Sequence, residues 1–262
     1  DEGVETKLIP RIPGTRTSAV VLGIEPPDRF PLVYYRENCA DNAMTIDHVL
    51  AANVSQFRCL EISGTALSKE PCRSAAFFAV EEAVRASVPV MLDLDFRQDQ
   101  WHDARAFGVT TRALLPRVNV AIGTEEEVLA TMLTDPNQIT VQHQQMSAPE
   151  IRGNLDDAIA GILKLGVEAL IVKRGSDGAS IHLPDGSAQV VPGFPVEIVN
   201  VLGAGDAFAT GFIYGFLEGW DHYKSCRMGN ACGAIVVTRH GCANFMPYHD
   251  ELFAFVEEKG GF

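Results

Sequence analysis

The sequence predicts an α/β fold built on a mainly parallel sheet, and two observations carry that prediction. Short apolar runs alternate with amphipathic helical segments along most of the 262 residues, which is the order expected when right-handed crossovers join parallel strands. Polar residues also follow apolar runs directly, as Asp93 does. Because ligands bind at the carboxyl ends of the strands in such sheets, we expect a site at that edge.

The beginning of the chain has a different pattern. Residues 1–16 are polar and lack an opening apolar strand, whereas residues 17–23 and 32–36 are β-rich runs joined by a loop that contains Pro26 and Pro27. The two runs predict an antiparallel pair with a long connection. It is either an edge hairpin of the main sheet or a separate small sheet that covers a site.

The rest of the chain alternates helical and strand patterns. Helices are expected at residues 46–54, 70–86, 104–115, 125–133, 156–165, from about 203 to 218, and at 225–240. Strands are expected at 59–62, 88–92, 118–122 and 169–173, followed by a hairpin of 179–183 and 188–191. Residues 134–153 show no clear period, and we interpret them as a long surface loop.

Composition limits the possible partners. The chain is 47% hydrophobic and 21% charged, which suits one large domain or two unequal ones. A net charge of −13 argues against binding to nucleic acid or to an anionic membrane surface, and no run approaches the ~20 apolar residues of a membrane span. The six cysteines lack zinc-site spacing, so we expect reduced thiols and a cytoplasmic protein.

The stretch NVLGAGDAFATGF, residues 200–212, is the strongest candidate for chemistry. Gly203 and Gly205 flank Ala204 immediately before a predicted helix. Glycines let the backbone approach a ligand closely, and the first amides of a helix point outward without a partner, which attracts phosphate. Asp206 lies in the first turn. A carboxylate at that place can serve as a base.

Several alternative motifs fail on spacing. A dinucleotide fingerprint requires a third glycine where the chain has Phe208, and no Walker A sequence follows. Asp93-Leu94-Asp95 resembles the paired acids of haloacid-dehalogenase phosphatases, but Phe96 and Arg97 replace the expected small residue. Metalloprotease and serine-hydrolase motifs are not present.

Taken together, the motifs resemble those of the PfkB, or ribokinase-like, carbohydrate kinases. VLGAGDAFATGF looks like the second signature of that family, and residues 93–97 are similar to the DxNxR segment of its sugar-acid kinases. Residues 125–127 lie where the family keeps an NxxE magnesium motif, 175–178 resemble its nucleotide loop, and 229–232 its adenine-side helix. The resemblance implies a ribokinase-like three-layer sandwich with a mainly parallel sheet and a small β lid.

The resemblance also implies a reaction. Such kinases transfer the γ-phosphoryl group of ATP to a primary sugar hydroxyl, mainly by positioning and charge stabilisation. Asp206 would be the general base, and the amides of Gly203, Ala204 and Gly205 would form the anion hole. Mg²⁺ would accompany the nucleotide, with Glu127 acting on it through water.

Substrate contacts follow from the same resemblance. Tyr34, Arg36 and Arg97 are expected to contact a sugar acid, because a guanidinium binds a carboxylate in a bidentate fork. The alternative for Arg97 is a simple ion pair with Asp93 or Asp95.

Nucleotide contacts are expected from two further segments. Lys173, Gly175 and Gly178 would border the phosphates or ribose of ATP, and Asn230 would line the adenine pocket. A purely structural glycine turn explains residues 175–178 almost as well.

The segment LVYYRENCAD, residues 32–41, most resembles the branch of the family that phosphorylates 5-dehydro-2-deoxygluconate in myo-inositol catabolism. A 2-keto-3-deoxygluconate kinase or another PfkB sugar kinase is the alternative. A non-catalytic sugar or nucleotide binder of the same fold is a second, because the family's opening strand and glycine-rich sugar-binding segment have no counterpart here. We therefore expect the chain to be an N-terminally incomplete view of a longer enzyme.

Three further expectations complete the interpretation. Residues 1–42 would be part of a β lid with linkers, and residues 43–262 the α/β kinase domain. The lid could pair between subunits and give a homo-oligomer. Thr124 replaces the Asn of NxxE, and Asn200 and Leu202 replace an Asp and a Thr found near a monovalent cation in many relatives, so the resemblance leaves the use of such a cation open.

Overall fold

The computed structural model describes residues 3–24, 30–141 and 149–262. The predicted loop with Pro26 and Pro27 and the glutamine-rich centre of the predicted loop 134–153 lie outside the described residues. Within the described ranges, no helix combines the length and apolar character needed to cross a bilayer.

A six-stranded sheet forms the centre of the molecule, with the order β10-β9-β8-β5-β4-β3. The parallel strands are β3 (Leu60–Ser63), β4 (Val90–Asp93), β5 (Val120–Thr124) and β8 (Ala169–Lys173). The antiparallel strands β9 (Ala179–His182) and β10 (Ala188–Val191) form a hairpin at one edge. All four residues of β4 are buried, as continuous apolar strands covered on both faces must be. The mainly parallel sheet is confirmed.

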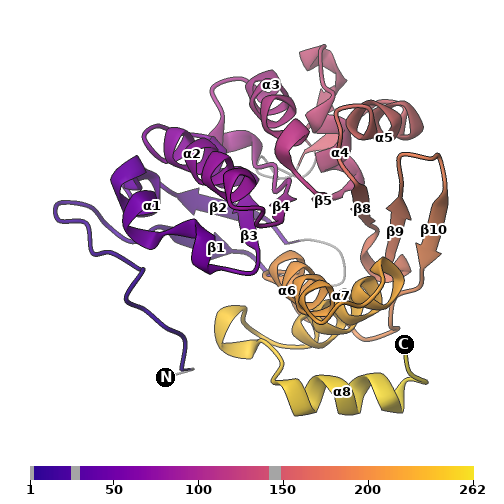
Figure 1. The fold of residues 1–262 in the computed structure, drawn as a ribbon. Coiled ribbons are helices and arrows are strands. Elements are labelled where there is room, and N and C mark those ends of the chain that lie inside the picture. The colour runs from indigo at the N-terminus through magenta and orange to yellow at the C-terminus, as the bar shows by residue number, and fades with distance from the viewer. Residues whose placement is uncertain (1–2, 25–29, 142–148) are drawn as a thin grey trace.

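Helices cover both faces of this sheet, which gives three layers (Figure 1). One face carries α2 (Cys72–Arg85), α3 (Ala104–Leu114), α4 (Glu125–Thr131) and α5 (Leu155–Leu163). The opposite face carries α6 (Ala204–Leu217) and α7 (His222–Val237). Strand residues alternate between the two cores: Leu92 packs toward α2–α5, and Met91 packs toward α6 and α7.

The helices at the end of the chain differ from the prediction. Helix α7 begins at His222 because the side chain of Asp221 accepts a hydrogen bond from the amide of Lys224 at 2.8 Å, an N-cap that precedes the apolar pattern. Helix α8 (His249–Glu258) was not predicted. It packs against the α6–α7 layer through the buried residues Leu252 and Val256.

The segment 134–153, which we interpreted as a long surface loop, contains two short strands near its ends. Strands β6 (Ile139–Thr140) and β7 (Glu150–Ile151) pair in antiparallel fashion. Ile151 is buried in the core beside α4 and α5. Burial of that side chain brings the ends of the segment together.

The first described strands, β1 (Ala19–Leu22) and β2 (Leu32–Tyr35), form a separate two-stranded antiparallel sheet. The predicted pair is confirmed, and the alternative of an edge hairpin of the main sheet is wrong. We call this pair the β1–β2 sheet. In the view of Figure 1 it is drawn on the same side of the molecule as α1 (Ile46–Ala52) and β3, and a hydrogen bond from Arg97 to Tyr34 joins it to the segment after β4. Val21 lies opposite Val33, whereas Val20 lies opposite Tyr34, so Tyr34 and Val33 point to different faces.

Candidate active site

Polar side chains from three elements meet at the carboxyl edge of the parallel sheet. Asp93 ends β4, Lys173 ends β8, and Thr124 ends β5 between them. Helix α6 begins beside this edge, so that a Cβ atom built on Gly205 would lie 3.4 Å from Lys173 Nζ. The structure thus brings together Asp93 and Lys173, which are 80 positions apart in the sequence.

A cavity of about 600 Å³ opens at this edge. Its polar end is lined by Arg97, Glu127 and Lys173. Its apolar part is lined by Phe194, Val196, Ile198, Ala234 and Val237. Small-molecule sites in proteins have volumes of roughly 300–1,000 Å³. A charged end joined to an apolar wall suits a ligand that carries phosphates at one end and a flat base at the other.

The glycine-rich turn forms the start of α6 and lines the cavity at Ala204 and Gly205. Gly203 is the N-cap residue, with φ of +86°, a conformation that favours glycine. The buried Asn200 stabilises the turn by accepting a hydrogen bond from the Leu202 amide at 2.9 Å. The Ala204 amide donates to Val201 O at 3.2 Å within the turn. That amide, unlike an outward-pointing one, is already engaged.

Asp206 lies in the first turn of α6 and is open to solvent. Partial exclusion of water raises the pKa of Asp206, and the like charge of Asp95 adds to that rise, while Lys173 and Arg97 oppose it. A raised pKa makes a carboxylate a stronger base once it is ionised.

Lys173 is nearly buried and forms ion pairs with two acids. Its Nζ lies 3.1 Å from Asp93 Oδ1 and 3.9 Å from Glu127 Oε2. Burial alone would lower the pKa of Lys173, but the two carboxylates outweigh it and hold the pKa above its usual value. For Asp93, burial raises the pKa, and Lys173 offsets part of that rise. The Lys173 ammonium therefore stays protonated.

Arg97 is also surrounded by partners. Its Nε donates to Tyr34 Oη at 3.1 Å, and its guanidinium lies 2.8 Å from Asp95 Oδ1 and 3.6 Å from Glu127 Oε1. These acids hold the pKa of Arg97 above its usual value despite burial. Asp95 has φ of +36°, which is unusual for a non-glycine residue, and Ser63 Oγ donates to it at 2.8 Å. The pairing with Asp95 that was the alternative for Arg97 is present in this structure.

Arg36 lies apart from the cavity lining. Its guanidinium forms an ion pair with Asp41 and hydrogen bonds with Gln100 and Asn42. These bonds attach the end of β2 to the loop that follows Arg97. The contact of Arg36 with a substrate stays a prediction.

Glu127 forms a capping box with Thr124. The Thr124 amide donates to Glu127 Oε2 at 2.8 Å, and the Glu127 amide donates to Thr124 Oγ1 at 3.3 Å. Thr124 therefore serves as the N-cap of α4 in place of the family's Asn. Among the described residues, no group of three or more His, Cys, Asp or Glu side chains is arranged to hold a metal ion. The oxygen donor of Glu127 fits Mg²⁺ that is held mainly by a nucleotide and water.

Gly175 and Gly178 lie in a short turn after β8 that lines the cavity. Gly178 has φ of +93°, and a Cβ atom there would lie 2.2 Å from Val191 O. Asn230 is buried in α7, and its Nδ2 donates to Val191 O at 3.2 Å and to Pro192 O at 3.0 Å. Asn230 lines the cavity and at the same time holds the backbone of its wall.

Sequence reasoning missed two features of the site. Phe194 and its neighbours in the linker after β10 form the apolar wall. Glu61, on the edge strand β3, faces the acids of the site: burial, followed by the charges of Asp93 and Asp206, raises the pKa of Glu61 to about 7. Strand alternation was the available signal, because it places Glu61 on the same face as Ser63.

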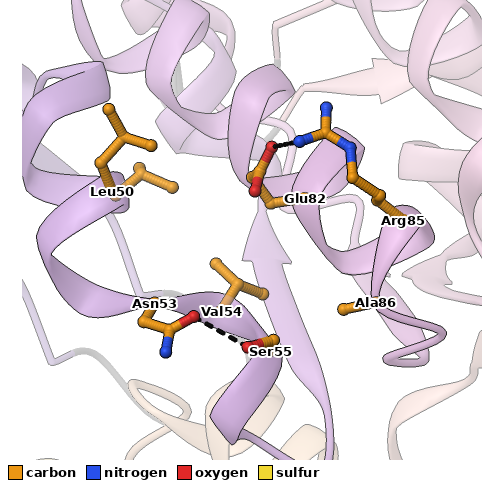
Figure 2. Close-up of a pocket in the computed structure, with 8 residues that line it drawn as sticks. Leu50, Asn53, Val54, Ser55, Glu82, Arg85 and Ala86 are labelled. Carbon is orange, nitrogen blue, oxygen red and sulfur yellow. Dashed lines mark hydrogen bonds and ion pairs between the residues drawn. The ribbon is translucent and has the colours of Figure 1, made fainter.

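A second hollow of about 330 Å³ lies between α1 and α2 (Figure 2). Its polar side chains are engaged locally, since Ser55 Oγ donates to Asn53 Oδ1 at 2.8 Å and Arg85 pairs with Glu82 at 2.5 Å. Ala86 lies just before β4, so this hollow is at the amino end of the sheet. It is therefore remote from Asp206.

Three layers, with a cavity at the carboxyl edge of the central sheet, give the chain the ribokinase-like fold. The chain belongs to the pfkB family of carbohydrate kinases, whose sequence profile matches residues 1–248. It is accordingly a phosphotransferase with an alcohol group as acceptor.

Two curated relatives carry the name 5-dehydro-2-deoxygluconokinase. The protein of Clostridium tetani is 30% identical over 99% of this chain and 73% of its own length. The protein of Geobacillus thermodenitrificans is 31% identical over 98% of this chain and 72% of its own length.

Solved structures show the same fold. A double mutant of the fructokinase of Vibrio cholerae, with fructose, ADP and potassium ion bound, has a TM-score of 0.76 at 22% identity and covers 93% of this chain and 74% of its own. The aminoimidazole riboside kinase of Salmonella enterica, in complex with its riboside and an ATP analogue, has a TM-score of 0.69 at 22% identity, over 85% of this chain and 70% of its own.

Proposed function

We propose that this protein is an ATP-dependent kinase that phosphorylates the primary hydroxyl of 5-dehydro-2-deoxygluconate. The observation that carries the proposal is the position of Asp206 in the first turn of α6, directly after the glycine turn that lines the cavity. The relatives named for this activity, each about 30% identical along nearly the whole chain, support the choice of substrate.

The roles of the residues follow from their positions. Asp206 takes the proton of the sugar hydroxyl as the oxygen–phosphorus bond forms and the bond to ADP breaks. Gly203 and Gly205 supply amides to the transferring phosphoryl group, and Ala204 contributes if its bond to Val201 yields. The products are ADP and the sugar-acid phosphate.

ATP would occupy the 600 Å³ cavity. Its base would lie against the apolar wall near Phe194 and Asn230, and its phosphates near Lys173 and the turn at Gly175 and Gly178. When bound, Mg²⁺ neutralises phosphate charge. Glu127 is the residue that would orient its water.

The sugar acid would lie between the β1–β2 sheet and the start of α6. Tyr34 and Arg97 are already in contact, and Arg97 lines the cavity. The carboxylate of the sugar acid can replace Asp95 as the partner of Arg97, so that the guanidinium stays paired. Arg36 is retained as a proposed contact, although it requires a change of partners.

The test is a coupled assay of ADP release with 5-dehydro-2-deoxygluconate and 2-keto-3-deoxygluconate in parallel. We expect a higher kcat/KM for the first, and about 10²–10⁴-fold lower kcat for Asp206→Asn. Equal or better use of the second acid would reassign the substrate. An unaffected Asp206→Asn would refute the mechanism, and no turnover with any sugar would favour a non-catalytic binder.

A second copy of the chain would cover the β1–β2 sheet. Val21, Val33 and Tyr35 on one face are 56%, 51% and 61% exposed, and a two-stranded sheet alone is at best marginally stable. Light scattering should give a dimer, and Val33→Asp should give a monomer. A monomeric wild type contradicts this.

The six free cysteines agree with a cytoplasmic location, which we also propose.

A further inference from the structure

The ion pair of Asp93 and Lys173 spans β5 at the carboxyl edge of the sheet, where Lys173 lines the cavity. Lys173 Nζ lies 3.1 Å and 3.3 Å from the two oxygens of Asp93, and the side chains are only 12% and 9% exposed. Both residues are the last of their strands. Strand geometry therefore fixes the pair, and neither partner lies on a loop.

The same ammonium lies against the first turn of α6. A Cβ atom on Gly205 would be 3.4 Å from Lys173 Nζ, and both residues line the cavity. An ammonium has three donors. The two oxygens of Asp93 accept from it at 3.1 Å and 3.3 Å, whereas Glu127 Oε2, at 3.9 Å, lies beyond hydrogen-bond distance. Donor capacity of the ammonium therefore remains for a ligand in the cavity that Lys173 lines.

We propose that Asp93 is a positioning residue for phosphoryl transfer: it fixes the Lys173 ammonium beside Gly205, so that a permanent positive charge and the amides of the turn face the transferring group together. The inference rests on the proposed function. In the step itself Lys173 keeps its proton, because the proton of the sugar hydroxyl goes to Asp206.

Two physical arguments support this role. The other cation that lines this end of the cavity, Arg97, is paired with Asp95 and Tyr34 and is proposed to bind the sugar acid. Lys173 is the one that lies beside the glycine turn, since its Nζ is 3.4 Å from a Cβ atom built on Gly205. A buried ion pair also contributes little net stability compared with apolar packing. Its location at the cavity is better explained by the placing of a charge where transferred charge develops.

The competing explanation is that the pair only ties β4 to β8. This explanation predicts that Asp93→Asn lowers the melting temperature but does not change how tightly the protein binds the terminal phosphate of the nucleotide. A positioning role predicts instead that Asp93→Asn and Lys173→Met lower kcat and the affinity for the terminal phosphate in the same way. These two losses should not be additive in the double variant.

The experiment compares Asp93→Asn, Lys173→Met, Lys173→Arg and the double variant, with Asp103→Asn as a control. Asp103 caps α3 and pairs with Arg105. Its substitution by asparagine therefore removes a carboxylate that does not line the cavity. The measurements are kcat, KM for ATP, and calorimetric affinities for ADP and for a non-hydrolysable ATP analogue.

We expect Asp93→Asn and Lys173→Met each to lower kcat by about 10–100-fold, with KM for ATP changing less. Each should also lower the affinity for the analogue relative to ADP by about 5–10-fold. The double variant should resemble the single ones, and Asp103→Asn the wild type.

An Asp93→Asn protein that folds and keeps the wild-type kcat and affinity ratio overturns the proposal. If that variant does not fold, Lys173→Met against Lys173→Arg decides: equal values overturn the proposal, and recovery with arginine supports it. The affinity ratio needs no sugar. It therefore tests Asp93 even if neither sugar acid is phosphorylated, an outcome that would refute only the proposed function.

Discussion

Arg97 Nε donates a hydrogen bond to Tyr34 Oη at 3.1 Å, and this contact joins the β1–β2 sheet to the charged end of the cavity. Arg97 also reaches Asp95 and Glu127. The position of the small sheet is therefore coupled, through one side chain, to the residue proposed to orient magnesium-bound water. The hydroxyl stays protonated, since burial raises the pKa of Tyr34 and Arg97 offsets only part of that rise.

Removal of this hydroxyl should weaken sugar-acid binding more than turnover. Hydrogen bonds to charged groups contribute about 1.5–3 kcal/mol, so we expect Tyr34→Phe to raise KM for the sugar acid by roughly 10–100-fold. Tyr35→Phe is the matched control, because Tyr35 lies on the other face and is 61% exposed. Steady-state kinetics of both variants check the prediction, and equal KM values for the two would contradict it.

The activity should fall on the acid side at a higher pH than an ordinary aspartate would give. A general base must be ionised, and partial exclusion of water together with the charge of Asp95 raises the pKa of Asp206. The profile of kcat/KM against pH should therefore rise through that elevated pKa and level off above it. Asp95→Asn removes one cause of the elevation and should move the acid limb to lower pH. A limb that stays in place refutes the assignment of this titration to Asp206.

The sequence alone was sufficient for the sheet and most helices, because their patterns are local. Residues 169–172 form a continuous apolar run that is followed by Lys173, and β8 coincides with the prediction at both ends. Helix α8 was missed because its amphipathic pattern is short and follows a segment without a clear period. The ends of the 134–153 segment were misinterpreted because the pairing of Ile151 depends on a distant core.

The site was only partly predictable for the same reason. The resemblance to the family's motifs pointed to Asp206, Lys173 and Gly178, and the structure places Lys173 and the start of α6 side by side. The partners of charged side chains depend on which strands are neighbours. The pairing of Lys173 with Asp93 follows from the order β8-β5-β4, which the sequence does not state.

Glu61 should make the protein less stable at neutral pH than at acid pH. Partial exclusion of water, together with the charges of Asp93 and Asp206, raises its pKa to about 7, whereas the pKa of a glutamate in the unfolded chain is 4.5. The unfolded state thus releases the proton first, and the free energy of unfolding falls as pH rises from about 4.5 to about 7.

Glu61→Gln should remove this loss of stability above neutral pH, because glutamine does not ionise. Because solvent reaches this side chain and screens the charges, the gain in the free energy of unfolding should be only about 1 kcal/mol, or a Tm about 2–4 °C higher than wild type at pH 8. The difference should shrink toward pH 5. Thermal melts across this range check it, with Glu81→Gln on the exposed side of α2 as the control. A difference independent of pH would show that Glu61 acts in another way.

The turn at Gly178 should not tolerate a side chain, for two separable reasons. Gly178 has φ of +93°, and a Cβ atom would lie 2.2 Å from Val191 O, the carbonyl that Asn230 holds. Gly186, in the β9–β10 turn, has φ of +85° but nothing within 4 Å of such a Cβ atom. Alanine at Gly186 therefore reports the backbone cost alone, about 1–2 kcal/mol, whereas alanine at Gly178 must also displace the wall of the cavity.

We expect Gly178→Ala to lower Tm more than Gly186→Ala and to raise KM for ATP by at least about 10-fold, while Gly186→Ala leaves KM unchanged. Thermal melts and ATP titrations on both variants decide, and equal effects on KM would mean that this turn does not border the nucleotide.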